Sequence, residues 1–407
     1  MAIEDEPQSL GVDLGAPPAI PDSARRRVVD LLESGLLHRY AEARSVGEDV
    51  ACLEEEFAAS LGRKYAVGLN SCGSSMFLSL LTTGVTQGSR VLMNSFTLAP
   101  VPGAVAHAGG EHVLVEITDD LVIDLDDLDR KARDSGARHL LLSHMRGHIA
   151  DMDAVVEICR RHGITLIEDC AHTQGARWAG QPTGTFGATG CFSFQSYKHV
   201  NAGEGGMLVT DDDDIAARAI LYSGSYMLYG QHRARPPEAA FERWKLATPN
   251  FSLRMSNIVA ALARAQLPLV DERARKWNDS HDRIARGLDS LPGVRLPNRP
   301  QAESYVQSSI QFALAALDDR AFAAFLAGCK ARGVFIKWFG AREPAGFTSQ
   351  SRSWGYIADP HTPPETARIL DRLCDLRIPL SLEADDCARL VSIVRSELAR
   401  AGSAAKP

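Results

Sequence analysis

The sequence lacks any uninterrupted apolar run close to the roughly 20 residues that a membrane-spanning helix needs. Its first residues, MAIEDEPQSLG, are acidic and contain no apolar segment, so we expect no secretory signal peptide. The eight cysteines include no CxxC pair and are scattered between positions 52 and 387. Cysteines spaced in this way are typical of reduced core residues, so we expect a cytoplasmic protein.

The sequence has no excess of basic residues. Lys and Arg number 44 against 51 Asp and Glu, which gives a net charge of −7. Because nucleic acid is bound through basic surfaces, we do not expect it as a partner. Two nucleotide-binding patterns are also absent: there is no GxxxxGK[ST], and no GxGxxG follows the first predicted strand.

What the sequence does contain is a regular alternation of β-rich runs and helical periods up to about residue 210. The predicted strands are Tyr65–Leu69, Arg90–Asn94, Glu111–Glu116, His139–Ser143, Thr165–Glu168, Cys191–Phe194 and Met207–Thr210. Helical segments lie between most of them, such as Asp151–His162, which begins with acidic residues and ends RRHG. This alternation predicts an α/β fold with a mostly parallel sheet covered by helices on both faces.

The pattern changes after residue 285, where Gly293–Pro300 forms a turn-rich joint. The predicted strands and helices beyond it are Gln307–Ala313, Val334–Lys337, Asp319–Arg332, Pro364–Leu376 and Ala384–Leu398. We therefore expect a flexible segment over residues 1–20, a large domain over 21–285 and a smaller α/β domain over 286–407. The large domain is expected to begin with an amphipathic helix.

Two ionisable residues stand at the carboxyl ends of predicted strands, where ligands of such sheets bind. Asp169 ends an apolar strand, where a carboxylate is costly unless a cation meets it. Lys198 follows the strand CFSF and precedes a glycine-rich turn. A pyridoxal phosphate site requires such a pair, with the lysine forming a Schiff base and the acid keeping the ring nitrogen protonated. A structural ion pair is the other interpretation of the same two residues.

A turn of small residues offers a place for a phosphate. Asn70 to Ser75, NSCGSS, follows the strand YAVGL and precedes the helical run MFLSLLTTG. Small residues at such a turn expose backbone amides at a helix N-terminus, which favours phosphate. A plain helix cap has the same composition, so both interpretations stay open.

Taken together, the motifs resemble those of the DegT/DnrJ/EryC1/StrS aminotransferases, which are fold-type I enzymes dependent on pyridoxal 5′-phosphate. The resemblance runs from about Gly11 to Leu398. The segments that carry it, in the family's order, are NSCGSS, NSFTLAP, SHMRGHIADMDAV, IEDCAHTQGA, CFSFQSYKHVNAGEGG, PNFSLRMSNIVAAL and RIPLSL. The short spacing from Lys198 to GEGG is most similar to the branch of the cyclitol aminotransferases and aminohydroxybenzoate synthase.

The resemblance implies a role for several residues. Lys198 matches the Schiff-base lysine, and Asp169 matches the partner of the ring nitrogen. The residues that match the rest of the cofactor site are Gly73 and Ser74 at the phosphate turn, Ser193 as a phosphate-binding serine, and His172 near the ring hydroxyl. Asn250 matches an asparagine that reaches the phosphate of the neighbouring subunit, which implies a homodimer with composite active sites.

Some segments depart from the family pattern. An aromatic residue usually covers the cofactor face, and Leu98 stands at that position here, two residues after Phe96. If the segment is extended, both side chains lie on one face, so either is a candidate to cover the ring. The stretches Gly224–His232 and Ile336–Trp354 do not match common sugar-aminotransferase patterns, which leaves the acceptor undefined.

No metal site is expected. His144 and His148 have a helical i,i+4 spacing, and Asp151 lies nearby, but the segment is predicted to be a strand followed by a loop. The segment also belongs to a motif of the non-metal family.

The sequence thus predicts a transaminase. An amino acid donor, glutamate or glutamine, is expected to pass its amino group to a polar keto acceptor such as a keto-sugar or cyclitol. Two alternatives remain: dehydration or other carbanion chemistry on the same scaffold, and a cofactor-binding regulator without turnover. Lys198 argues against the regulator, because binding alone requires no Schiff-base nucleophile.

Overall fold

The computed structural model describes residues 9–40, 48–314, 317–341, 350–358 and 360–404. Its largest element is a seven-stranded sheet in the order β1-β9-β8-β5-β4-β2-β3. The strands are β1 (Tyr65–Leu69), β2 (Arg90–Asn94), β3 (Glu111–Val115), β4 (His139–Ser143), β5 (Thr165–Asp169), β8 (Thr189–Ser193) and β9 (Gly206–Thr210). The pairs from β3 through β2, β4 and β5 to β8 are all parallel, and β9 alone runs in the opposite direction.

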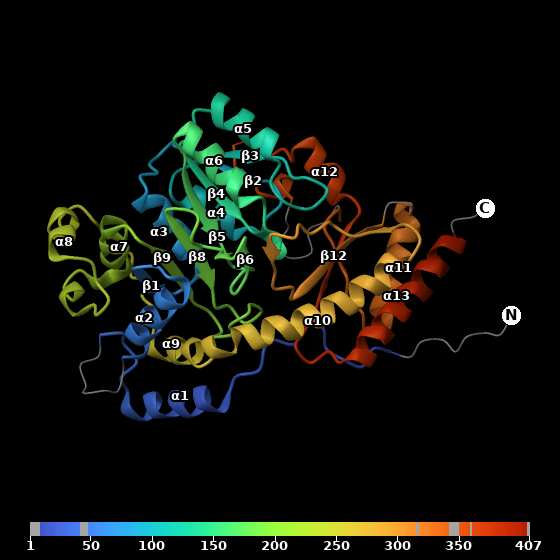
Figure 1. The fold of residues 1–407 in the computed structure, drawn as a ribbon, viewed down its shortest axis with the longest axis horizontal. Coiled ribbons are helices and arrows are strands. Elements are labelled where there is room, and N and C mark those ends of the chain that lie inside the picture. The colour runs from blue at the N-terminus through green and yellow to red at the C-terminus, as the bar shows by residue number, and fades with distance from the viewer. Residues whose placement is uncertain (1–8, 41–47, 315–316, 342–349, 359, 405–407) are drawn as a thin grey trace.

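Apolar side chains fill both faces of this sheet, as expected of a parallel sheet between helices. Along β4, for example, Leu141 belongs to one hydrophobic cluster, whereas its neighbours Leu140 and Leu142 belong to another. The helices around the sheet are α2 (Asp49–Leu61), α3 (Cys72–Thr82), α4 (Pro100–His107), α5 (Leu125–Asp134), α6 (Met152–His162), α7 (Asp213–Ile220) and α9 (Asn257–Arg264). Figure 1 shows the sheet between these layers, with α1 (Asp22–Ser34) and α8 (Glu238–Trp244) at the periphery.

A second, antiparallel sheet lies beside the first (Figure 1), in the order β10-β12-β14-β13. Its strands are β10 (Val294–Arg295), β12 (Ser309–Leu314), β13 (Lys337–Trp338) and β14 (Leu373–Arg377). The helices that accompany it are α10 (Val270–Asp289), α11 (Asp319–Ala331), α12 (Pro364–Leu370) and α13 (Ala384–Ala404). A small third sheet joins the two parts through β6 (Arg177–Trp178), β7 (Gln181–Pro182) and β11 (Glu303–Ser304).

The predicted fold class is confirmed, and the seven predicted strands of the large sheet all form, most within one or two residues of their expected ends. One predicted helix is wrong. The segment Pro364–Leu376 is helical only to Leu370, and its second half is the strand β14. Its apolar residues suit a helix locally, but pairing with β12 on one side and β13 on the other buries nearly the whole strand.

The predicted N-terminal segment is described from residue 9 onward. Leu10 is fully buried, and its amide donates a hydrogen bond to the carbonyl oxygen of Arg332 at 2.9 Å. Further along, the carbonyl of Pro18 accepts a hydrogen bond from the Asn201 side chain at 2.8 Å. This part of the segment is therefore bound both to the end of α11 and to the loop after β8, and the predicted domain boundaries stay a prediction. Among the described residues, no helix has the length and apolar character to cross a bilayer.

Candidate active site

Three neighbouring parallel strands, β4, β5 and β8, end in polar residues at the same edge of the large sheet. Ser143 ends β4, Asp169 ends β5 and Ser193 ends β8. All three residues line a cavity of about 840 Å³. The opposite wall of this cavity is formed by residues of the second sheet, including Lys337 and Arg377. The register of the parallel strands thus gathers the polar groups that the sequence separates by fifty residues.

Asp169 is buried and fixed at the floor of this cavity. Its side chain is 4% exposed. One carboxylate oxygen accepts a hydrogen bond from the hydroxyl of Ser143 at 2.8 Å, and the other accepts one from the amide of Ala171 at 3.1 Å. Thr97 donates to the Ser143 hydroxyl at 2.9 Å and thereby orients it towards Asp169. These donors stabilise a charged carboxylate in a buried place.

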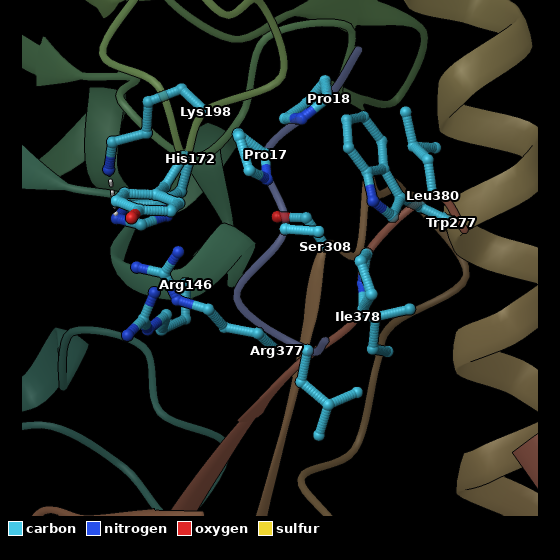
Figure 2. A pocket seen from close by; sticks show the side chains of 14 residues that line it. Pro17, Pro18, Arg146, His172, Lys198, Trp277, Ser308, Arg377, Ile378 and Leu380 are labelled. Carbon is cyan, nitrogen blue, oxygen red and sulfur yellow. Dashed lines mark hydrogen bonds between the residues drawn. The ribbon is translucent and has the colours of Figure 1, made fainter. Parts of the chain in front are cut away.

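Lys198 enters the same cavity from the loop that follows β8. Its Nζ lies 2.9 Å from Nε2 of His172, and Figure 2 shows the two side chains joined by this contact. Burial, and then the positive charge of Arg146, lower the pKa of Lys198 to about 8. Burial and the neighbouring Lys198 hold the pKa of His172 well below its ordinary value. The lysine therefore loses its proton readily beside a neutral imidazole.

A cradle for an anion lies at the N-terminus of α3. Ser71 caps this helix, and its hydroxyl accepts a hydrogen bond from the amide of Ser74 at 3.0 Å. The first amides of any helix have no partner within the helix and point towards whatever lies beyond its end. Gly73 lines the cavity, and a Cβ at this glycine would meet only the Ser71 hydroxyl, at 3.7 Å. The strand β9 closes the back of the turn, where a Cβ on Gly206 would lie 2.3 Å from the carbonyl carbon of Ser71.

These residues fit pyridoxal 5′-phosphate. The cavity offers a buried carboxylate for the ring nitrogen and an amine of low pKa for the aldehyde. A helix N-terminus with hydroxyl groups is available for the phosphate. The fit rests on three different chemical groups arranged around one cavity rather than on the lysine alone.

Most of the predicted site residues lie together. Those that line the cavity are Gly73, Leu98, Asp169, His172, Ser193 and Lys198. Ser74 belongs to the same turn, and its hydroxyl donates a hydrogen bond to the Asn70 side chain at 2.6 Å.

Two predicted residues lie elsewhere. Phe96 is fully buried and packs edge-on against Phe339 with 5.1 Å between the ring centres, so Leu98 faces the cavity and Phe96 does not line it. Asn250 is exposed and does not line this cavity, and its side-chain oxygen accepts a hydrogen bond from the Ser252 amide at 2.8 Å.

The sequence did not reveal several polar residues of the cavity, which are Ser143, Arg146, Lys337, Asp375 and Arg377. Ser143 had a usable signal, because it ends a predicted strand at the edge where ligands bind. Arg146 follows it in the motif SHMRGH and has a left-handed backbone, with φ 57° and ψ 21°. The other three lie on β13 and β14, and the second of these strands was predicted as a helix.

The histidines of SHMRGH have other partners than a metal ion. Nε2 of His148 lies 2.8 Å from the side-chain oxygen of Gln311 on β12. Nε2 of His144 lies 3.2 Å from Glu168. Glu168 and Cys170 are close enough to His144 to share an ion. However, the Glu168 carboxylate already accepts hydrogen bonds at 2.8–2.9 Å from three backbone amides, those of Gly184, Phe186 and Gly187.

Comparison with protein families gives one match over nearly the whole chain. A model of the DegT/DnrJ/EryC1/StrS aminotransferase family matches residues 23–395. The match spans both sheets and every residue of the cavity described above except the N-terminal Leu14 and Gly15.

Curated relatives are similar over a large part of their length. The chain is 29% identical to the spore coat polysaccharide biosynthesis protein SpsC of Bacillus subtilis, over 69% of this chain and 70% of that protein. It is 34% identical to GDP-perosamine synthase of Caulobacter vibrioides, over 56% of this chain and 58% of that enzyme. The chain thus aligns with somewhat more than half of the perosamine synthase.

A solved structure matches over a greater length. The crystal structure of 3-amino-5-hydroxybenzoic acid synthase superimposes with a TM-score of 0.81 at 23% identity. The superposition covers 95% of this chain and 99% of that one. At this identity the similarity shows the fold.

The low pKa of Lys198 generates a first prediction. In the cofactor-free protein, the rate at which trinitrobenzenesulfonate modifies Lys198 should rise with pH around a midpoint of about 8. Because folding favours the neutral amine, the folded protein binds fewer protons than the unfolded chain between pH 8 and the ordinary lysine pKa of 10.5. This group's contribution to stability therefore increases with pH across that window. Peptide mass spectrometry at each pH measures the modification.

A variant and an internal control sharpen this measurement. Arg146→Gln removes a positive charge that lowers the pKa of Lys198, so the midpoint should move to higher pH. The surface residue Lys245, whose pKa a hydrogen bond to Glu242 raises, should react only at higher pH in both proteins. An unchanged Lys198 midpoint in Arg146→Gln would show that the arginine does not act on this amine.

Proposed function

The chain belongs to the DegT/DnrJ/EryC1/StrS aminotransferase family, whose members depend on pyridoxal 5′-phosphate, and we propose that it aminates a polar, ring-shaped ketone. The proposed donor is glutamate or glutamine, and the proposed acceptor is a keto-sugar, a cyclitol or a related ring. The observation that carries this proposal is the placement of Lys198 and Asp169 in one cavity with the α3 cradle.

When bound, pyridoxal 5′-phosphate supplies an aldehyde that carries the amino group and a ring that withdraws electrons from the reacting carbon. Asp169 lies where it can hold the proton on the ring nitrogen, because its carboxylate is fixed by Ser143 and Ala171. Gly73, Ser74 and Ser193 are the proposed phosphate ligands, and Leu98 is the proposed cover of the ring face. Each of these groups binds or orients the cofactor and takes no part in proton transfer to or from the substrate.

Lys198 has two successive tasks. With the cofactor bound, its amine would hold the aldehyde, and the free amine would act as the general base towards the α-carbon of the donor. A pKa of about 8 makes this amine a base that can accept a proton near neutral pH. His172, whose Nε2 lies 2.9 Å from Nζ, orients the amine.

The net exchange is balanced without an oxidant. In the first half, the donor leaves as a 2-oxo acid whose carbonyl oxygen comes from water, and its amino group stays in the enzyme. In the second half, the acceptor's carbonyl oxygen leaves as water, and its carbon receives the amino group. Lys198 moves one proton in each half, in opposite directions.

A homodimer with shared active sites is part of the proposal. Asn250 lies outside the cavity of its own chain and is exposed. Large apolar side chains are exposed near it in the sequence and in the preceding loop, namely Tyr226, Met227, Leu246 and Phe251. Such a group of exposed apolar residues is typical of a protein–protein interface. A second copy seated there would bring Asn250 to the phosphate of the first.

We also propose the cytoplasm as the compartment in which the enzyme works. All eight cysteines are free thiols. Seven of them are buried, where they act as small apolar side chains. This use of cysteine suits a reducing compartment.

The donor half-reaction tests the proposed activity directly. With glutamate or glutamine alone, the holoenzyme should lose the visible absorbance of lysine-bound cofactor and gain that of the aminated form. Lys198→Ala should show neither the starting absorbance nor the change. Asp169→Asn should fold, since an amide can still accept from Ser143, but should convert at least about a hundredfold more slowly. Stopped-flow absorbance measures the rates.

The same experiment separates the alternatives. A dehydratase or lyase would consume its substrate without any keto acceptor, and a regulator would show no spectral change with any amine. Lys330→Ala on the exposed surface of α11 serves as the control, and its rate should equal that of the parent. Retention of the lysine-bound absorbance in Lys198→Ala would contradict the assignment of this lysine.

Mixed dimers test the composite site. Lys198→Ala and Asn250→Asp should each be nearly inactive at limiting cofactor, the second because its carboxylate repels the phosphate. In a mixed dimer, one of the two sites regains both native residues, so an equal mixture of reassociated chains should recover about a quarter of the parent activity. Analytical ultracentrifugation checks that the dimers form. Activity no greater than that of the two separate variants would contradict sharing of Asn250.

A further inference from the structure

Three cations face Lys198 and His172 across the cavity. Arg146 comes from the turn after β4, Lys337 from β13 and Arg377 from β14. We call these three residues the basic cluster. Figure 2 shows the side chains of Arg146 and Arg377 extending towards His172 and Lys198. The second sheet therefore contributes two of the three cations, and none of the three is among the residues matched to the cofactor site.

Arg146 is the only member of the cluster with a carboxylate partner among the described residues. Its Nη2 lies 2.6 Å from an oxygen of Asp375, and the two side chains are 10% and 2% exposed. Its Nε is buried and has no hydrogen-bond partner in the part of the chain that the structure describes. The other oxygen of Asp375 accepts a hydrogen bond from Gln311 at 2.7 Å. The charge of this single carboxylate also acts on Lys337 and Arg377, so one acid is shared among the three cations.

Arg377 and Lys337 pair with neighbouring strands through their backbones, but their side chains make no hydrogen bond or ion pair with any described residue. The Arg377 guanidinium lies 4.3 Å from the ring centre of Tyr197, and Nζ of Lys337 lies 4.6 Å from that of Phe339. Both side chains are only partly exposed, and burial is the main cause that lowers the pKa of each, to about 8 for Lys337. The other carboxylates on the cavity wall form no ion pair with these two cations. Asp169 accepts a hydrogen bond from Ser143, and Glu204 is exposed.

The cluster is thus a concentration of partly desolvated positive charge with one carboxylate for three cations. Removing cations from water without a counter-charge is costly, so such an arrangement favours an anionic ligand. A guanidinium also offers paired donors that match the geometry of a carboxylate or phosphate. We propose that the basic cluster binds an anionic group, a carboxylate or phosphate, carried by the acceptor ketone away from its reacting carbon. This inference rests on the proposed function and narrows its acceptor class.

The position of the cluster points to the acceptor as well as to the donor. Arg146 is already paired with Asp375, whereas the side chains of Arg377 and Lys337 face the cavity with aromatic rings as their contacts. Arg377 and Lys337 therefore remain available for a second anionic group. Since donor and acceptor occupy the same cavity in turn, a neutral ring would leave these cations uncompensated during the second half-reaction.

Binding of unreactive rings to the holoenzyme tests the cluster without turnover. Cyclohexane carboxylate and cyclohexyl phosphate should each bind at least tenfold more tightly than neutral cyclohexane carboxamide by isothermal titration calorimetry. Arg377→Gln, which breaks no hydrogen bond in the described structure, should remove most of this preference. Arg377→Lys should keep part of it. Arg295→Gln, on an exposed arginine paired with Asp119, is the matched control and should change nothing.

The two half-reactions then separate donor from acceptor. With holoenzyme first aminated by the donor, an oxo-cyclohexane carboxylate should react with a kcat/KM at least tenfold above that of its carboxamide. Arg377→Gln should reduce that ratio more than it reduces kcat/KM for the donor. If cyclohexyl phosphate binds more tightly than cyclohexane carboxylate, the anionic group of the acceptor is assigned as a phosphate. If the carboxylate binds more tightly, the group is assigned as a carboxylate.

Equal affinity for acid, phosphate and amide in the parent enzyme, including no measurable binding of any of them, would overturn the inference. The inference would also be overturned if Arg377→Gln lowered kcat/KM for the donor and left kcat/KM for the acceptor unchanged. Failure of the proposed function would be recognised separately. In that case the donor alone would not convert the bound cofactor, and this result does not depend on the charge of any acceptor.

Discussion

The site depends on one buried carboxylate at the end of a parallel strand. Asp169 is held in the interior by hydrogen bonds that Ser143, at the end of the next strand, and the amide of Ala171 donate to it. That arrangement requires β4 and β5 in parallel register, with Ser143 opposite Asp169. The same sheet edge delivers Ser193 from β8 and the loop that carries Lys198. The acid and the amine thus meet through this alignment of strands, and the cradle is added by the turn between β1 and α3.

Positive charge around the cavity completes this arrangement. Arg146, in the turn after β4, lowers the pKa of Lys198. The side chains of Lys337 and Arg377, on the second sheet, form no ion pair among the described residues. One feature therefore serves two purposes, since it keeps the lysine reactive and makes the cavity receptive to anions. The left-handed backbone of Arg146 is consistent with this role, because strained residues persist where the surrounding structure holds them for function.

Much of the large sheet was predictable because its strands are buried on both faces and appear as short apolar runs between turns. Asp169, at the carboxyl end of one of them, was predictable for the same reason, whereas Ser193 was expected only from the resemblance to the family. The strand β14 was not, since its sequence has a helical apolar period and only its pairing with β12 and β13 makes it a strand. Lys337 and Arg377 were missed too, although Lys337 ends the predicted strand Val334–Lys337 and Arg377 begins the motif RIPLSL. No local pattern tells which side chains a second sheet will turn towards a distant lysine. Leu98 and Phe96 were indistinguishable in an extended segment, and packing against Phe339 decided between them.

The central claim is that the amine of residue 198, facing the acid of residue 169, is the one that bonds to the cofactor. Lys337 is the natural competitor, because it lines the same cavity and its pKa is also lowered to about 8. Borohydride reduction of the holoenzyme makes the bond permanent, and digestion followed by mass spectrometry locates the modified lysine. We predict the label on the peptide that contains Lys198 in near-stoichiometric amount. A label on Lys337, or on any other lysine, would contradict the account.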